Sequence, residues 1–259
     1  MSDTMELEEP IKGNITKKPE PGAPDYRKAW IANVNEYNDK VDPHPFCHGI
    51  QMDTHHLISE KALEKCDKAL QDSLVDKGYN MNSLENLVGI PATFRGACHL
   101  GTQVHRSDHK FKKNQFDEIL NYDYHETIKD LVTEKKQDIN ECYGTTATEE
   151  SERYIHKEIM DKVSQKVLRR ISSFALPLTS IHTNFQRPQD PQDPQDPQDP
   201  QDPYIGCGEG EKVGEVKGGK NCCANKGNHN GEIDTRPGSD FTLDSAINFP
   251  QEWDLTRRI

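Results

Sequence analysis

The sequence predicts an α+β fold, mostly helical, that is followed by a polar, low-complexity C-terminal extension. Apolar residues recur every fourth position from Ile155 to Ile171, which places them on one face of a helix. Two short segments, 46–55 and 82–91, hold the brief apolar runs typical of strands. Hydrophobic residues make up only 32% of the 259 residues, against about 45–50% in an average domain. We therefore expect one compact core of about 120 to 150 residues, flanked by polar segments.

Composition divides the chain into four regions. Residues 1–24 carry charges, Pro and Gly without periodicity, and we expect them to form a disordered arm. Residues 25–180 hold the periodic apolar segments and form the predicted compact domain. Residues 181–203 contain five copies of Pro-Gln-Asp, which predict an extended spacer. Residues 204–259 form a Gly-rich tail, whose late apolar residues either fold back onto the core or serve as a motif for a partner.

The first and last helices of the predicted domain follow from apolar spacing. Residues 25–41 place Trp30, Val34 and Tyr37 on a helical period. This helix either packs on the core or docks a secretion partner or chaperone. Thr146 and Glu149 form a capping box ahead of the last helix, whose apolar stripe is either core or a partner surface.

Two further helices are expected between these ends. Ser59 is a good N-cap, and we expect a helix from there to Gly78, which supplies the stop. Thr102 is expected to open a helix that carries His105 and His109 and continues its buried face to Phe116 and Leu120. The predicted strands at 46–55 and 82–91 lie before and between these helices.

The net charge of −12 argues against nonspecific coating of nucleic acid, but the charge is uneven. One stretch of twenty residues, 94–113, carries five bases and one acid (Arg95, Arg106, Lys110, Lys112 and Lys113 against Asp108). Such a local basic patch is sufficient to engage a phosphate, although a solvated helix face is the simpler alternative for the lysines.

The seven cysteines do not have the spacing of a Cys-x-x-Cys zinc module. The acidic, polar start of the chain does not resemble a signal peptide, and no apolar run has the length of a membrane span. We expect a protein made in the bacterial cytoplasm without membrane association, which leaves the cell, if it does, without a cleavable leader.

Histidines provide the clearest sign of chemistry. His55 and His56 are adjacent, and His105 and His109 are four residues apart, a spacing that places two side chains on one helix face. Imidazole is the commonest protein ligand for ions such as Zn, Ni and Cu. If His55 packs against the His105/His109 pair, three nitrogens converge on one ion and leave positions open, as in catalytic sites. His56 is then available as a base.

The His-His-Leu-Ile run at 55–58, the segment 86–91 and the His105/His109 pair resemble the AHH branch of the HNH/endonuclease VII nuclease superfamily. These are ββα-metal nucleases, found in bacterial polymorphic toxins and type VI secretion effectors. The resemblance covers about residues 45–122.

The resemblance departs from the family pattern at two places. Thr54 stands where an Ala is usual, and Ser107 or Asp108 where a Gly is usual. Neither position supplies a ligand. The resemblance implies a ββα-metal core at about 45–122 with a helical extension at 123–180.

The resemblance also implies a role for each residue of the site. His55, His105 and His109 would hold one divalent ion, His56 would be the general base, Asn86 would tie the loop and position the base, and Arg106, or less clearly Arg95, would contact phosphate. The ion is Zn, Ni, Mn or Mg, and imidazole ligands favour the first three because Mg prefers oxygen.

The sequence therefore predicts a metal-dependent endonuclease, a DNase that acts as an antibacterial toxin. Its expected partners are DNA, a cognate immunity protein and a secretion component, and its expected place of action is the cytoplasm of a target cell. Two alternatives stay open: an RNase toxin on the same scaffold, and a noncatalytic zinc-stabilised interaction module.

Overall fold

The computed structural model describes residues 11–38, 44–105, 109–113, 119–145, 154–180 and 253–255. The chain divides into two compact units that alternate along the sequence. The first comprises residues 1–31, 56–88 and 125–169, and the second comprises 32–55, 89–124 and 170–259. One division between the units falls at the peptide bond that joins His55 to His56.

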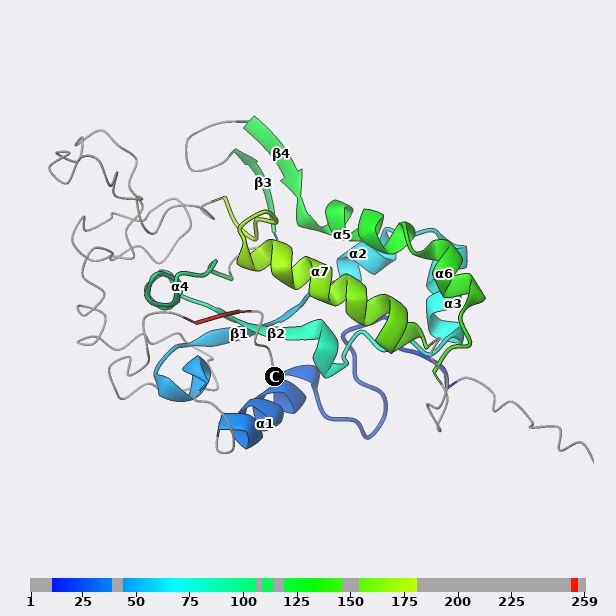
Figure 1. Cartoon of the computed structure of the whole chain (residues 1–259), viewed down its shortest axis with the longest axis horizontal. Coiled ribbons are helices and arrows are strands. Elements are labelled where there is room, and N and C mark those ends of the chain that lie inside the picture. Colours follow the sequence, from blue (N-terminus) through cyan, green and yellow to red (C-terminus); the bar gives the residue numbers. More distant parts are fainter. Residues whose placement is uncertain are drawn as a thin grey trace, which may run out of the picture. The chain divides into compact units, whose positions relative to one another are not determined.

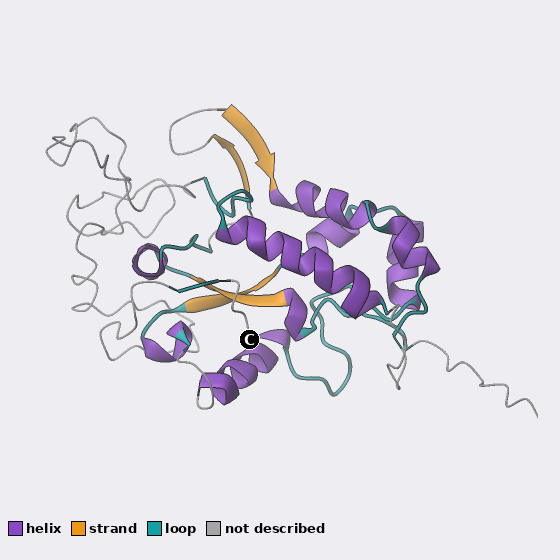
Figure 2. Cartoon of the chain, viewed as in Figure 1, coloured by secondary structure: helices purple, strands orange, loops and turns teal. Residues whose placement is uncertain are grey.

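Helices predominate among the described residues, and the strands form two short pairs (Figures 1 and 2). The α-helices are α1 (Tyr26–Asn38), α2 (Glu60–Glu64), α3 (Lys68–Asp76), α4 (Phe94–Leu100), α5 (Tyr124–Thr133), α6 (Lys136–Glu141) and α7 (Asp161–Ser172). Two short 3-10 helices, η1 (Pro45–His48) and η2 (Leu84–Asn86), and a π-helix, η3 (Ile155–Met160), complete the helical elements described. Strand β1 (Met52–His56) pairs with β2 (Leu87–Pro91), and β3 (Lys110–Lys113) pairs with β4 (Ile119–Asp123). The predicted α+β class is confirmed.

In the first unit, the single helix expected after Ser59 is interrupted. The Ser59 hydroxyl accepts the Ala62 N–H, as predicted for the N-cap of α2. Asp67 then caps a new helix, because its carboxylate accepts the Leu70 N–H at 2.9 Å. Gly78 follows the end of α3 with φ +83°, the left-handed conformation that favours glycine. The expected stop is therefore correct, and the expected continuity is wrong.

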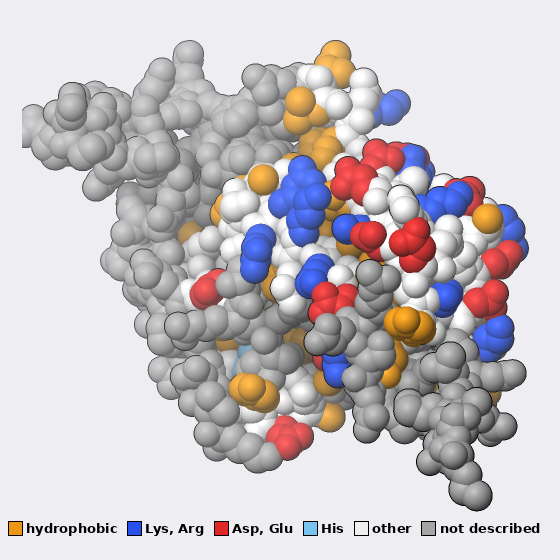
Figure 3. All heavy atoms as spheres, turned by 45° about the vertical axis from the view of Figure 1, so that its right-hand side comes forward, with side chains coloured by type: hydrophobic (Ala, Val, Ile, Leu, Met, Phe, Trp, Pro, Cys, Tyr) orange, Lys and Arg blue, Asp and Glu red, His pale blue; other side chains and the backbone are white. Residues whose placement is uncertain are grey.

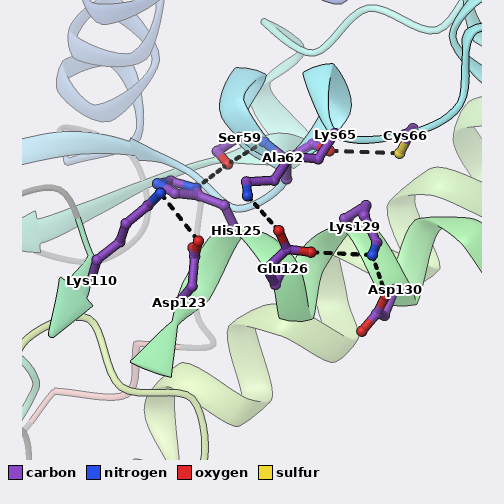
Figure 4. A network of polar contacts seen from close by, with 10 residues as sticks. All are labelled: Ser59, Ala62, Lys65, Cys66, Lys110, Asp123, His125, Glu126, Lys129 and Asp130. Carbon is purple, nitrogen blue, oxygen red and sulfur yellow. Dashed lines mark hydrogen bonds and ion pairs between the residues drawn. The ribbon is translucent and has the colours of Figure 1, made fainter. Parts of the chain in front are cut away.

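Side chains of α5 join α2 by polar contacts (Figure 4). The Ser59 hydroxyl and His125 Nδ1 form a hydrogen bond of 2.8 Å, and both residues are buried. Glu126, one residue further along α5, forms ion pairs with Lys65 and Lys129 at the surface. Because the exposed pairs are screened by water, the buried Ser59–His125 bond is the contact that fixes α5 locally.

The N-terminal segment expected to be disordered is partly described. The Ile11 N–H donates to the Thr145 carbonyl, and the Asn14 N–H donates to the Tyr79 carbonyl, each at 2.8 Å. A Cβ added at Gly13 would lie 2.3 Å from the Tyr79 carbonyl oxygen, so only glycine permits this close approach. Residues 11–14 are thus held by the first unit, and residues 1–10 lie outside the described part of the chain.

The first and last predicted helices are present. Residues of the predicted apolar stripe in η3 and α7 are all buried (Ile155, Ile159, Val163, Val167 and Ile171). Trp30 is buried in α1, but Tyr37 is 42% exposed and does not join it. The capping box at Thr146 and Glu149 lies outside the described residues.

In the second unit, the helix expected to carry His105 and His109 does not form. Helix α4 ends at Leu100, because Gly101 adopts φ +66° and redirects the chain. His109 has φ +62°, which no right-handed helix accommodates, and β3 begins at the next residue. Leu120, expected on the buried face of that helix, lies in β4 and is 49% exposed.

The described C-terminal residues lie against the second unit. Leu255 is only 1% exposed, and the Trp253 ring meets the His44 ring edge-on with centroids 5.1 Å apart. These contacts favour the fold-back alternative for the end of the tail. The Pro-Gln-Asp repeats lie outside the described residues. None of the described helices has the length and apolar character needed to cross a bilayer.

Candidate metal centre

Three histidines from separate parts of the second unit converge on one point. His55 lies near the end of β1, His105 follows α4 after a short coil, and His109 immediately precedes β3. One nitrogen from each ring lies within 4.8 Å of the other two. His55 and His109 are buried and His105 is half-buried. The predicted convergence of these three side chains is therefore present in the structure, although not by way of a helix.

Backbone contacts place the two later histidines. The His105 N–H donates to the Pro91 carbonyl at the end of β2, at 2.8 Å. The His109 carbonyl accepts the Tyr124 N–H at 3.1 Å, so the two ends of the β3–β4 hairpin are joined at the site. Because β2 pairs with the strand that carries His55, the first of these bonds brings His105 toward His55.

The distances suit a single ion. His55 Nδ1 and His105 Nε2 are 3.0 Å apart, and the three ring centroids are 5.0–5.1 Å from one another. Two nitrogens bound to one tetrahedral Zn at about 2.0–2.1 Å are roughly 3.3 Å apart. The arrangement therefore fits a transition-metal ion with only small movements of the rings.

Each ring also has an outer partner on its remaining nitrogen. Tyr124 Oη lies 3.1 Å from His55 Nε2, and Asp53 Oδ2 lies 3.2 Å from His105 Nδ1. The Leu178 carbonyl accepts from His109 Nδ1 at 3.0 Å. Protein ligands of metals usually have such outer partners, which fix the orientation and tautomer of each imidazole. All three candidate ligands meet this condition.

Sequence reasoning missed these outer partners. Asp53 could have been found, because it lies two residues before His55 in a strand and alternate residues share a face. No local sequence pattern indicated that Tyr124 or Leu178 would contact the site. Leu178 is placed by Gln103, whose side chain accepts the Leu178 N–H at 2.8 Å. The Gln103 amide also donates to the carbonyls of Ile171 and Leu176, which fixes the segment after α7.

His56 has a different set of contacts, all within the first unit. Its Nε2 lies 2.9 Å from Asn82 Oδ1, and its ring centroid is 4.4 Å from that of Tyr26. Burial lowers the pKa of His56 to about 4, and this effect exceeds the opposing effect of the Asn82 hydrogen bond. The imidazole is therefore neutral near pH 7. The metal-binding group within the described residues does not include His56, and its role as a base stays a prediction.

Asn86 is buried with its amide group fully bonded. Its Oδ1 accepts from the Ile58 N–H at 2.8 Å and from the Ser164 hydroxyl at 3.0 Å. Its Nδ2 donates to the carbonyls of Ile58 and Met81. These bonds hold the segment that directly follows His56, and no polar atom of the amide is left for a substrate. The geometry thus agrees with a positioning role for Asn86.

Only some of the residues predicted to contact phosphate lie in the described part of the chain. Arg106 lies outside the described residues, and Arg95 lies on α4. Lys110 pairs with Asp123 across the hairpin at 3.1 Å, whereas Lys112 is exposed. On the face drawn in Figure 3, Lys and Arg side chains stand beside Asp and Glu side chains. The role of Arg106 stays a prediction.

Comparison with protein families gives a match. The model of the AHH family, a nuclease family of the HNH/ENDO VII superfamily with conserved AHH, matches residues 37–167. This range spans half of the chain and contains all three clustered histidines. Searches of curated proteins and of solved structures find no significant match. Thr54 replaces the alanine of the family motif, and its hydroxyl is buried without a hydrogen-bond partner among the described residues.

Proposed function

Because the chain belongs to the AHH nuclease family of the HNH/ENDO VII superfamily, we propose that it is a metal-dependent endonuclease that hydrolyses the phosphodiester bonds of DNA. The observation that carries this proposal is the convergence of His55, His105 and His109, each with an outer hydrogen-bond partner. A noncatalytic zinc module would use a closed set of four ligands, whereas the described cluster supplies three.

The three clustered histidines would hold the ion, and a bound divalent ion supplies positive charge that stabilises the phosphate oxygens and the leaving alkoxide. His56 is the proposed general base. Its Nε2–H donates to Asn82, so the lone pair that accepts a proton from the attacking water is on Nδ1. Asn86 holds the backbone beside this base, and Arg106 contacts the phosphate.

The finer biological role is also a proposal. We infer an antibacterial toxin that acts in the cytoplasm of a target cell and is neutralised by a cognate immunity protein in the cell that makes it. The support is the resemblance of residues 45–122 to ββα-metal toxin nucleases. Strands β1 and β2 pair within that range and α4 follows β2, with α2, α3 and η2 between the two strands.

The proposal is tested with the purified full chain, supercoiled plasmid and Mg, Mn, Ni or Zn, with and without chelator. We expect nicking and linearisation that require an added metal and disappear in His105→Ala. Parallel incubation with RNA identifies the preferred substrate, and degradation of RNA alone would replace DNA in the proposal. An intact plasmid and intact RNA under every metal, with no toxicity on expression, would contradict it.

A further inference from the structure

Tyr124 contacts two of the three proposed metal ligands. Its hydroxyl lies 3.1 Å from His55 Nε2, and its backbone N–H donates to the His109 carbonyl at 3.1 Å. Its ring centroid is 5.5 Å from both imidazoles. The side chain is fully buried at the start of α5, so its position is set by packing.

The contacts around His55 determine which nitrogen faces the ion. His55 Nδ1 lies 3.0 Å from His105 Nε2, whereas His55 Nε2 lies beside the Tyr124 hydroxyl. A neutral imidazole carries one N–H and one lone pair. When Nε2–H donates to the Tyr124 oxygen, the Nδ1 lone pair faces the cluster.

The other two ligands have the opposite arrangement. His105 Nδ1 donates to Asp53, and His109 Nδ1 donates to the Leu178 carbonyl. Their Nε2 atoms therefore carry the lone pairs. The geometry points to mixed coordination, in which His55 binds the ion through Nδ1 while His105 and His109 bind through Nε2, with Tyr124 as the positioning residue that selects Nδ1. This inference rests on the proposed metal site and specifies its ligand atoms.

A phenylalanine at position 124 fills the same space but offers no hydrogen-bond partner to His55 Nε2.

The chain provides a matched control at Tyr122, two residues earlier. Its hydroxyl is buried and has no hydrogen-bond partner among the described residues. Its ring stacks on Phe111 across the hairpin, with centroids 4.8 Å apart. Tyr122→Phe therefore removes a buried phenol oxygen from the same hairpin without removing a ligand contact. The pair of variants separates the hydrogen bond to His55 from a general effect on packing.

The test uses the full chain with Zn²⁺ as the probe. In nitrogen-15 NMR of the imidazoles, we expect the zinc-loaded wild type to show His55 bound through Nδ1 and the other two ligands through Nε2. Zinc affinity, measured by competition with a chelating dye, should fall about 10- to 100-fold in Tyr124→Phe, the usual effect of losing an outer partner. Tyr122→Phe should retain the wild-type affinity.

The possible failures are distinguishable. A wild type that binds no divalent ion would overturn the proposed metal site itself. A wild type that binds zinc through His55 Nε2 would overturn the mixed coordination. A folded Tyr124→Phe with wild-type affinity would overturn the assignment to Tyr124. If Tyr124→Phe does not fold, the nitrogen assignment in the wild-type spectrum still decides the question.

Discussion

His55 and His56 are neighbours in one strand, yet their surroundings differ in kind. His55 lies among two further imidazoles, a phenol and, through His105, a carboxylate. His56 lies beside an amide and an aromatic ring, close to the segment that Asn86 holds by four hydrogen bonds. Because successive side chains of a strand point to opposite faces, one dipeptide supplies both regions.

The histidine cluster and the region around Asn86 differ in which groups form hydrogen bonds with their polar atoms. In the histidine cluster, one nitrogen of each ring is bonded outward and the other faces the remaining rings. Around Asn86, every polar atom of the amide is satisfied by the protein itself. Changes in the cluster should therefore alter ion binding more than stability, and changes around Asn86 should do the reverse.

The largest expected effect is on ion binding in His105→Ala. Removing one of three ligands should lower zinc affinity by more than about 100-fold, beyond the effect of losing an outer partner, and abolish plasmid cleavage. His56→Ala should bind zinc like the wild type and also fail to cleave, because it removes the proposed base. Calorimetric titration with zinc and gel analysis of plasmid measure the two properties.

The His56→Ala variant gives the sharper result of the two. Retained cleavage with retained zinc would remove His56 from the mechanism and leave the nuclease without an assigned base. Lost zinc binding in His56→Ala would show that His56, like His55, is needed to bind the ion.

The second prediction concerns stability. Asn86→Ala leaves a buried N–H and two buried carbonyls without their amide partner, and should lower the free energy of unfolding by about 2–4 kcal/mol. The exposed Asn140→Ala, which loses only a surface contact with Ser73, is the matched control and should stay within about 0.5 kcal/mol of wild type. Urea unfolding in the presence of chelator provides the measurement. Equal midpoints for the two variants would contradict the structural role of Asn86.

These two regions also show what sequence could predict. The convergence of His55, His105 and His109 followed from residue type and family pattern. The prediction of a helix that carries His105 and His109 was wrong. A spacing of four residues does not reveal the left-handed conformations at Gly101 and His109.

Tertiary contacts explain most of what sequence reasoning missed. Tyr124 and the Leu178 carbonyl reach the site only because the hairpin closes and Gln103 fixes the segment after α7. Neither contact follows a local pattern in the chain. Asp53 is the exception, since its position two residues before His55 was available from the strand period.

A smaller effect on zinc affinity is expected at Asp53, the outer partner of His105. Asp53→Ala removes the acceptor of the His105 Nδ1–H and should weaken zinc binding about 10-fold, the lower end of the range for outer partners. The side chain is about one-third exposed, so water replaces part of the lost contact. Asp53→Asn keeps an acceptor oxygen and should bind more tightly than Asp53→Ala in the same dye competition. An unchanged affinity in Asp53→Ala would show that His105 does not depend on this partner.

The smallest effect should come from Ser59, three residues after His56. Its hydroxyl accepts the Ala62 N–H at the start of α2 and is hydrogen-bonded to the buried His125. Ser59→Ala removes both bonds and should destabilise the chain by about 1 kcal/mol, a typical value for an N-cap, without changing zinc affinity. Ser173→Ala, at an exposed serine with one weak contact of 3.4 Å, should leave the urea midpoint unchanged. A loss of zinc affinity in Ser59→Ala would show that contacts near His56 affect ion binding at His55, His105 and His109. The proposed functional distinction between the His55 and His56 regions would then be wrong.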